Sequence, residues 1–276
     1  MERENRIMET ETVRQLREAV KTAKQSIEDT LIEIDDIKLQ QNPAIEADYT
    51  LKISTYENRL LQATVAARRA RRRATLAQAY VNKAQPVDED SIEKTLDAEF
   101  ADWQAKIDQA MDAYLKTMER RSGMKTMNPR DAKRLKELYR KLAKRLHPDL
   151  NPGQSRQEER LFAIAQSAYA AGDLQALESL WATIDNPSAT PQDAPAAQVE
   201  EELLAERALL EAQLSVIRER LAQLKSSFPY KYKDLLADAE WVASTVSHLK
   251  AQIEEQQHAQ ARFDEAYKRL VSGDVA

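Results

Sequence analysis

Apolar residues recur in alternating steps of three and four along most of the 276-residue chain, which is the spacing of a heptad repeat. Such spacing places one narrow apolar stripe on each helix and favours helices that wind around one another. The composition agrees with long, solvated helices, because 32% of the residues are charged and only 4 are glycine. The sequence therefore predicts an all-α fold in which long antiparallel helical hairpins of the coiled-coil type flank a small helical module.

The first hairpin is predicted over residues 1–84, with its turn at Gln40-Gln41-Asn42-Pro43. Asn42 is a suitable cap, and Pro43 is a suitable first residue of a new helix. Because so short a connection favours antiparallel neighbours, the two arms are expected to pack on each other. Their apolar positions are Val13, Leu16, Val20, Ala23, Ile27, Ile34 and Ile37 in the first arm, and Tyr49, Ile53, Tyr56, Leu60, Ala63, Ala67, Ala70, Ala74, Ala77 and Val81 in the second.

A second hairpin is predicted over residues 199–276, after a segment of linker composition at residues 185–198. Phe228-Pro229 separates its two arms. The heptads leave open whether the arms pair within one chain or between two chains, so a homodimer is an alternative. The apolar positions are Leu210, Leu214, Ile217, Leu221 and Leu224, followed by Leu235, Ala239, Val242, Val246, Leu249, Ile253, Phe263, Tyr267 and Leu270.

Residues 88–184, between the hairpins, predict a compact module of helices. A helix from about Ser91 to Arg120 comes first. A second helix begins at Asn128-Pro129, where asparagine is a good cap and proline favours the first helical turn. Pro148 has no N–H and excludes helical geometry at the preceding His147, so this helix must end there.

The helix before His147 has two faces of different character. Its buried stripe consists of Leu135, Leu138, Tyr139, Leu142 and Leu146. The opposite side, called the basic face below, carries Lys133, Arg134, Lys136, Arg140, Lys141, Lys144 and Arg145. After the loop, a capping box from Ser155 to Glu158 starts an apolar helix that ends at Gly172. The buried residues of this helix are Leu161, Phe162, Ala165, Ala168 and Tyr169.

A basic helix, a His-Pro-Asp loop and an apolar helix thus follow one another. The segments LYRKLAKRLHPDLNP and FAIAQSAY resemble the second and third helices of the J domain of DnaJ-like co-chaperones, over roughly residues 128–170. The wider layout is similar to bacterial J-domain proteins of undefined role. The sequence lacks the family's Tyr-x-x-Leu-Gly opening, its Gly/Phe-rich linker and its zinc module, and the helix at 91–120 is expected to replace the first J-domain helix.

The resemblance implies a non-enzymatic co-chaperone that stimulates the ATPase of a DnaK-type chaperone, with ATP hydrolysis taking place in the partner. It implies that Asp149 pairs with an arginine of the chaperone, that Pro148 holds the loop rigid and that His147 positions it. The basic face would then press against an acidic surface of the chaperone. The coiled-coil arms would recruit a client or a complex. The alternative is a coiled-coil scaffold or oligomerisation protein whose J-like module no longer couples to a chaperone.

Five arginines between Arg68 and Arg73 suggest a weaker alternative, a nucleic-acid-associated protein. The interspersed alanines occupy the apolar stripe, so the arginines point outward and are available to phosphates. In the predicted hairpin, Glu9 and Glu11 lie opposite and neutralise part of this charge. No aromatic residues for base stacking are interleaved, which disfavours single-strand binding.

Several classes of site are excluded by what the chain lacks. It has no cysteine, so disulfides and cysteine-ligated metals are excluded. His248 and His258 do not share a helix face at ligand spacing, and neither a metal nor a cofactor is expected. No stretch approaches the length of a membrane span, and Met1–Thr12 has no apolar signal region, so a cytoplasmic protein is expected.

Overall fold

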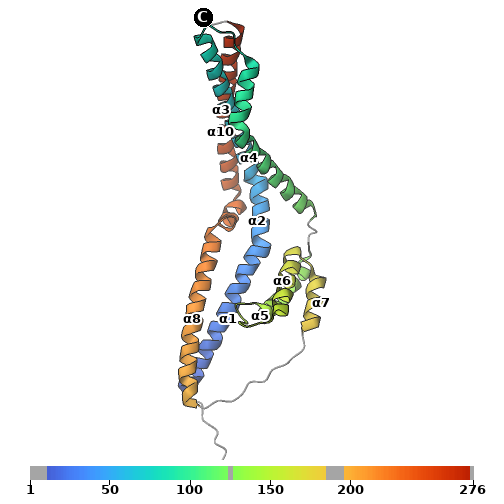
Figure 1. Ribbon diagram of the computed structural model, residues 1–276. Helices are drawn as coiled ribbons and strands as arrows, with labels where there is room; N and C mark the ends of the chain where they lie inside the picture. The colour runs from blue at the N-terminus through green and yellow to red at the C-terminus, as the bar shows by residue number, and fades with distance from the viewer. Residues whose placement is uncertain (1–10, 124–126, 185–195, 274–276) are drawn as a thin grey trace, which may run out of the picture. The chain divides into compact units, whose positions relative to one another are not determined.

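The computed structural model describes residues 11–123, 127–184 and 196–273. Every regular element in these ranges is helical, which confirms the predicted all-α fold (Figure 1). None of the helices in the described ranges is apolar over a length that would cross a membrane. The elements are α1 (Glu11–Asp36), η1 (Ile37–Gln41), α2 (Asn42–Tyr49), η2 (Thr50–Ser54), α3 (Thr55–Asn82), α4 (Glu89–Gly123), α5 (Pro129–Leu146), α6 (Arg156–Ala171), α7 (Leu174–Ile184), α8 (Ala196–Ser226), η3 (Tyr230–Tyr232), α9 (Lys233–Ala237) and α10 (Ala239–Ser272).

The chain forms two compact units, each assembled from separate stretches of sequence. The first unit combines Met1–Pro43 with Lys125–Lys231, and the second combines Ala44–Met124 with Tyr232–Ala276. Each unit contains one N-terminal and one C-terminal long helix. The first unit also contains the His-Pro-Asp loop.

In the first unit, α8 lies along α1 and runs in the same direction (Figure 1). Ion pairs at 2.6 Å join Lys24 to Glu206 and, nearer the ends of both helices, Glu33 to Lys225. Between these pairs the heptad positions meet in an apolar cluster. Its buried members are Ile27, Leu31 and Ile34 of α1 with Leu214 and Ile217 of α8.

Helices α5, α6 and α7, called the module below, enclose the second apolar cluster of this unit. The rings of Tyr139 and Tyr169 stack with centroids 4.1 Å apart, and the rings of His147 and Phe162 meet edge to face at 5.0 Å. The residue numbers rise on α6 as they fall on α5, so the two helices are antiparallel. The buried residues of the module core are Leu135, Tyr139, Leu142, Ala143, Leu146, Phe162, Ala165, Ala168, Tyr169, Leu177 and Leu180, joined by Ile32 of α1.

The ends of α5 and α6 are formed by the residues that the sequence predicts. The side chain of Asn128 caps α5, with Pro129 as the first helical residue. Ser155 and Glu158 form the complete capping box of α6. Gly172 ends α6 in the left-handed conformation, at φ +70°, which glycine adopts without strain.

In the second unit, α10 lies along α3, also in the same direction (Figure 1). Lys250 lies over the ring of Tyr56, and further along the pair Arg73 contacts Asp264 at 2.5 Å. Helix α4 packs on α3 as well, because the small alanines of α3 leave room for larger side chains. The buried cluster there consists of Ala74, Ala77, Ile92, Leu96 and Tyr267.

The two predicted hairpins are not formed in the described residues. Every residue from 11 to 82 has α- or π-helical structure, so the chain does not turn at Pro43. The N–H of Asn42 bonds to the carbonyl of Ile37, five residues earlier. This wider turn accommodates Pro43, which lacks an N–H and whose ring clashes with an ordinary α-helical turn. The heptads instead join N-terminal to C-terminal helices, α1 to α8 and α3 to α10, in parallel pairs.

The module predicted over residues 88–184 is also divided differently. Helix α4, which contains the predicted helix 91–120, belongs to the second unit, because its Ile92 and Leu96 fit against the alanine stripe of α3. The helix that packs on α5 and α6 from outside the module is α1. Of the predicted linker 185–198, residues 185–195 lie outside the described residues, and residues 196–198 already belong to α8.

Candidate functional site at the His-Pro-Asp loop

The loop between α5 and α6 is closed by hydrogen bonds to its own backbone. The N–H of His147 completes the last turn of α5 with a 2.8 Å bond to Ala143. Its carbonyl accepts the N–H groups of Leu150 and Asn151, both at 3.0 Å. Pro148 fixes the extended backbone of His147, at φ −69° and ψ 127°, so the chain leaves the helix sharply.

The side chain of His147 points into the module and is only 8% exposed. Its ring lies edge-on against Phe162, and its Nδ1 accepts the N–H of Asp149 at 3.1 Å. Nδ1 therefore carries no proton, and the neutral ring has its proton on Nε2. Burial lowers the pKa of His147 from its ordinary 6.5, outweighing the nearby charges of Asp35 and Asp149, which raise it. His147 holds the loop in place as a neutral residue.

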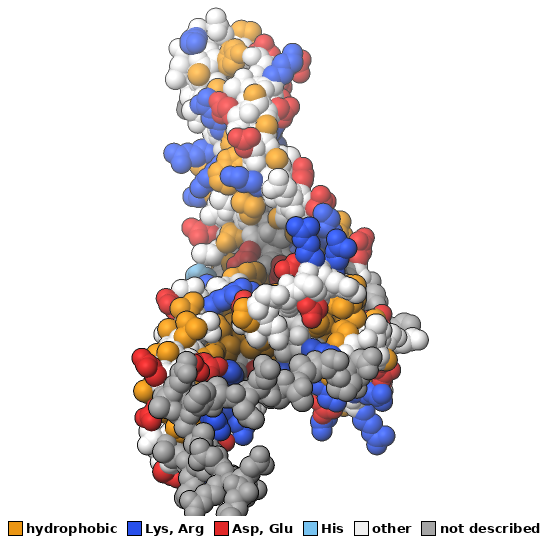
Figure 2. Space-filling model, turned by 60° about the horizontal axis from the view of Figure 1, so that its bottom comes forward, with side chains coloured by type: hydrophobic (Ala, Val, Ile, Leu, Met, Phe, Trp, Pro, Cys, Tyr) orange, Lys and Arg blue, Asp and Glu red, His pale blue; other side chains and the backbone are white. Residues whose placement is uncertain are grey.

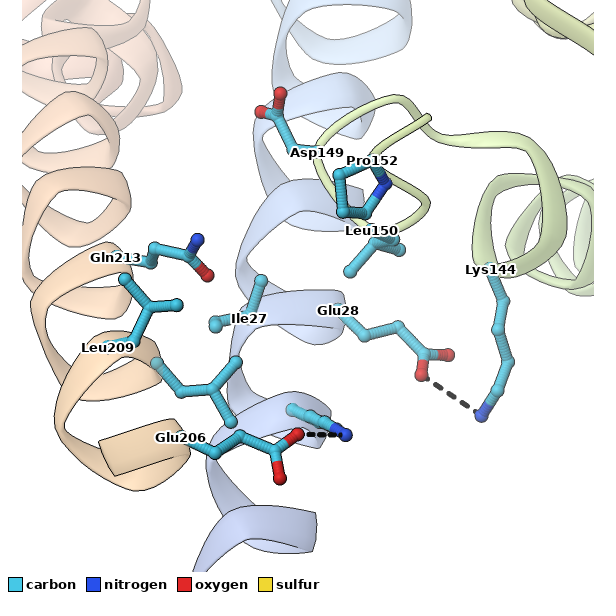
Figure 3. Close-up of a pocket in the computed structure, with 11 residues that line it drawn as sticks. Ile27, Glu28, Lys144, Asp149, Leu150, Pro152, Glu206, Leu209 and Gln213 are labelled. Carbon is cyan, nitrogen blue, oxygen red and sulfur yellow. Dashed lines mark ion pairs between the residues drawn. The ribbon is translucent and has the colours of Figure 1, made fainter. Parts of the chain in front are cut away.

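Pro148 and Asp149 are exposed at the tip of the loop. Asp149 uses its backbone N–H for the bond to His147, and within the described residues its carboxylate has no hydrogen-bond or ion-pair partner. Figure 3 shows this carboxylate pointing away from Lys144. An exposed carboxylate on a backbone that is fixed by a neighbouring side chain is well suited to bind a cationic group of another molecule.

A pocket of about 410 Å³ lies beside the loop (Figure 3). The loop contributes Asp149, Leu150 and Pro152 to its wall, Lys144 of α5 adds to it, and the other sides are formed by α1 and α8. Leu150 also packs against the apolar cluster that α1 and α8 share. The remaining lining residues are Lys24, Ile27, Glu28, Lys144, Glu206, Leu209, Leu210 and Gln213.

Three residues of the basic face are paired with acidic residues of α1. Lys136 Nζ lies 2.8 Å from Asp36, Arg140 lies 3.5 Å from Asp29, and Lys144 Nζ lies 3.0 Å from Glu28. The three cations are spaced by four residues on α5, which places them on one side of the helix. The acid numbers fall as the cation numbers rise, so α1 runs antiparallel to α5.

Beneath these ion pairs, the stacked tyrosines bind two buried aspartates of α1. The hydroxyl of Tyr139 donates to Asp35 and that of Tyr169 donates to Asp36, both at 2.6 Å. Burial, together with the adjacent carboxylate, raises the pKa of each tyrosine, so both hydroxyls remain donors. At Asp36, burial opposes ionisation, but hydrogen bonds from Lys136, Tyr169 and Gln41 outweigh it and lower the pKa.

The other members of the basic face mostly contact the module itself. Arg134 pairs with Glu178 of α7 at 2.6 Å, and Lys141 lies over the ring of Trp181. Lys133 lies 3.9 Å from Glu137 one turn further along α5. The charge of Arg145 acts on Glu158 of α6. In the space-filling view, basic and acidic side chains lie beside one another over the face shown (Figure 2).

The arginines between Arg68 and Arg73 lie in the second unit, and four of the five contact side chains of other described residues. Their acidic partners are on α4 and α10, which corrects the prediction that placed Glu9 and Glu11 opposite them. Glu11 pairs with Arg14, and Glu9 lies outside the described residues. The contacts are Arg68 over Trp103, Arg69 with Glu93 and Asp97, Arg72 with Glu99, and Arg73 with Glu93 and Asp264 and over Tyr267.

The acidic surface of α1 is the part of the site that the sequence analysis missed. A signal for it exists in the segment EDTLIEIDD, residues 28–36, which concentrates five acidic residues within about two and a half turns of helix. The predicted first hairpin arm contains this segment, but no partner was predicted for its acidic residues. No group of three or more His, Asp or Glu side chains among the described residues is arranged to hold a metal ion.

Comparisons with known proteins identify no relative. No protein-family model, no curated protein and no solved structure matches the chain.

Proposed function

We propose that this protein is a J-domain-type co-chaperone that stimulates ATP hydrolysis by a DnaK-type chaperone. The observation that carries the proposal is the loop itself, in which the buried His147 fixes a tip that exposes Pro148 and Asp149. This tip joins an antiparallel pair consisting of a basic and an apolar helix. The arrangement agrees with the resemblance of residues 128–170 to the J-domain hairpin.

Each residue has a distinct part in the proposed function. Asp149 presents its carboxylate to an arginine of the chaperone, as a charge-assisted contact. Pro148 and His147 are positioning residues, since they fix the direction in which Asp149 points. The basic face adds charge complementarity, which mainly increases the association rate and fixes the orientation of the partner. The hydrolysis takes place in the chaperone.

Client recruitment is assigned to the second unit in this proposal. Its helix α4 carries three large apolar side chains that are at least 42% exposed, Met111, Leu115 and Met118. They are spaced by three and four residues, so they share one side of the helix. Methionine-rich surfaces adapt to different apolar partners, which suits the binding of a client.

The proposal is tested by single-turnover ATP hydrolysis in a DnaK-type chaperone, with the full chain at increasing concentration. We expect stimulation by the natural sequence and loss of most of it in Asp149→Asn, which keeps the size of the side chain but removes its charge. Asp112→Asn is the matched control, because it removes one exposed carboxylate on α4, and it should stimulate normally. Equal stimulation by both variants would contradict the role of the loop.

One observation favours the alternative, a coiled-coil scaffold with an inactive J-like module. Three cations of the basic face are already bound by α1 in this structure. If α1 never leaves α5, those three cations stay paired with α1 instead of with a chaperone, and in this alternative no concentration of the protein would stimulate hydrolysis. No observation favours nucleic-acid binding, because most of the arginines between Arg68 and Arg73 are engaged within the second unit.

A further inference from the structure

Building on the function proposed above, we propose that helix α1 is an internal competitor for the chaperone-binding site: it occupies three cations of the basic face of α5, and the acidic surface of a partner binds them after α1 has moved away. The protein would then be regulated by an autoinhibitory contact within its first unit.

The first support for this inference is the chemistry of the contact. Asp36, Asp29 and Glu28 follow one another along Lys136, Arg140 and Lys144, as the carboxylates of an acidic partner surface would. A cation that is bound to one carboxylate is not available to a second in the same geometry. Binding of α1 and binding of an acidic partner therefore exclude each other.

The second support is that these ion pairs are exchangeable. The side chains of Lys136, Arg140 and Lys144 remain 48%, 50% and 66% exposed in the contact. Water and salt screen the exposed cations of these pairs, which limits their net contribution to stability, although the carboxylates of Asp36 and Glu28 are only 12% and 18% exposed. Replacing the acids of α1 by those of a partner is therefore close to neutral in free energy, and other contacts decide the balance.

The third support concerns the apolar surface of α1. Ile27, Leu31 and Ile34 are buried against α8, whereas Ile32 is the one residue of α1 in the buried core of the module. Helices α1 and α8 can therefore move away from α5 together, without opening their own seam. The main apolar losses would be Ile32, Leu39 of η1 and the loop residue Leu150, and the pocket beside Leu150 shows that packing there is incomplete.

The closed state is held by a small number of polar contacts. The hydroxyl groups of Tyr139 and Tyr169 bind Asp35 and Asp36, and the side chain of Gln40 donates to the backbone carbonyl of Tyr169. These bonds are buried or partly buried, and they set the free energy that a partner has to overcome. They make the closed form the dominant one without making it permanent.

The experiment compares release of α1 with locking of α1 in the ATPase assay. The release variant combines Glu28→Gln, Asp29→Asn and Asp36→Asn, which keep the side-chain shapes. We expect half-maximal stimulation at about a tenfold lower concentration than for the natural chain, a typical size for coupling between two sites. The matched control combines Glu11→Gln, Glu18→Gln and Glu33→Gln, which remove the same charge from α1 at residues whose ion pairs are with Arg14, Lys21 and Lys225.

Because the sequence contains no cysteine, two introduced cysteines can be cross-linked selectively to lock α1 in place. Gln40→Cys and Ala170→Cys are joined by a bis-maleimide reagent with a reducible bridge, at the end of the module away from the loop. The side chain of Gln40 lies on the carbonyl that precedes Ala170, so the two positions are neighbours. We expect the bridged protein to lose stimulation and to regain it after reduction.

The outcomes separate the inference from the proposed function. If the natural chain, the release variant and the bridged protein stimulate equally, α1 does not regulate the site, and the co-chaperone function stands. If neither the natural chain nor the release variant stimulates at any concentration, the proposed function is wrong and the inference fails with it. A release variant that is more active than both the natural chain and the control, with a bridged form that is inactive until reduced, supports both.

Discussion

Tyr139 donates a hydrogen bond of 2.6 Å to Asp35, across 104 residues of sequence. Both residues are buried, and the tyrosine ring is stacked on Tyr169 in the core of the module. The bond therefore joins α1 to the core of the module, whereas the cations of the ion pairs around it remain 48–66% exposed. It is the contact whose loss should weaken the α1–α5 interface most.

Tyr139→Phe should lower the free energy of unfolding of the first unit by about 1–3 kcal/mol, because it leaves the buried carboxylate of Asp35 without its donor. Urea denaturation followed by circular dichroism would measure the change. A double-mutant cycle with Asp35→Ala provides the control. The double variant should lose less than the sum of the single losses, since the bond is already absent in each. Additive losses would show that the two residues do not interact.

Leu142→Ala should destabilise the module by about 2–5 kcal/mol, because Leu142 is fully buried and the substitution leaves a cavity. Leu209→Ala removes the same atoms from a side chain of α8 that is 61% exposed, so its effect should stay within about 0.5 kcal/mol. The same urea denaturation measures both. Similar losses in the two variants would mean that Leu142 is not in the core.

The buried His147 should make the stability of the module depend on pH. Its pKa in the folded protein is lowered from 6.5, so the unfolded chain binds the proton more tightly. The stabilising contribution is complete above pH 6.5 and is lost as the pH falls from there through the folded-state pKa. Urea unfolding at about pH 7.5 and about pH 5.5 would measure the difference, in a range where carboxylates of ordinary pKa change little.

His147→Gln is the control for this pH dependence. Glutamine does not titrate, so the variant should be less stable than the natural chain at the higher pH but should lose less stability on acidification. An equally steep loss in both proteins would mean that another group causes it.

Pro43→Ala should raise the free energy of unfolding by about 1 kcal/mol, because alanine is the better residue inside a continuous helix, although the wide turn before Pro43 already relieves part of the proline strain. In a hairpin turn, where proline favours the first residue of a helix, the same change would be neutral or destabilising. Pro152→Ala is the control, because Pro152 lies in the loop after α5 and its replacement brings no gain in helix stability. If Pro43→Ala destabilised the protein, the result would support a hairpin turn at Pro43 and contradict the continuous helix.

Local signals in the sequence were sufficient for the module. Asn128-Pro129, the Ser155–Glu158 capping box and Gly172 act within one or two turns, and each is at the end of a helix in the structure. The buried stripe from Leu135 to Leu146 follows from helical periodicity in the same way. Such features need no knowledge of distant partners, which is why the helices around the loop could be predicted.

The pairing of the long helices could not be predicted by the same means. A heptad stripe indicates that a helix packs against another helix. The stripes of α1, α3, α8 and α10 are alike in character, so none of them specifies which helix is its partner. The short connection at Asn42-Pro43 then favoured the wrong pairing. A π-helical turn that carries a helix past proline has no reliable sequence signature.

The site shows the same division between local and distant information. The exposure of Asp149 and the sharp exit of the chain at Pro148 depend on residues that are adjacent in the sequence. The covering of the basic face depends on acids that precede it by about a hundred residues. The sequence shows the negative charge of residues 28–36 and the positive charge of the basic face. It does not show that the two are neighbours, which follows from the fold, where Asp36 lies beside Lys136.

The parallel pairing of early with late helices has a consequence for how the chain is made. Arg73 meets Asp264 across 191 residues, so α1 and α3 leave the ribosome long before α8 and α10 exist. The module, whose contacts are local, can fold at once, whereas the apolar stripes of α1 and α3 stay without their final partners until α8 and α10 have been synthesised. During synthesis, the nascent chain of this protein therefore exposes the kind of apolar surface that chaperones bind.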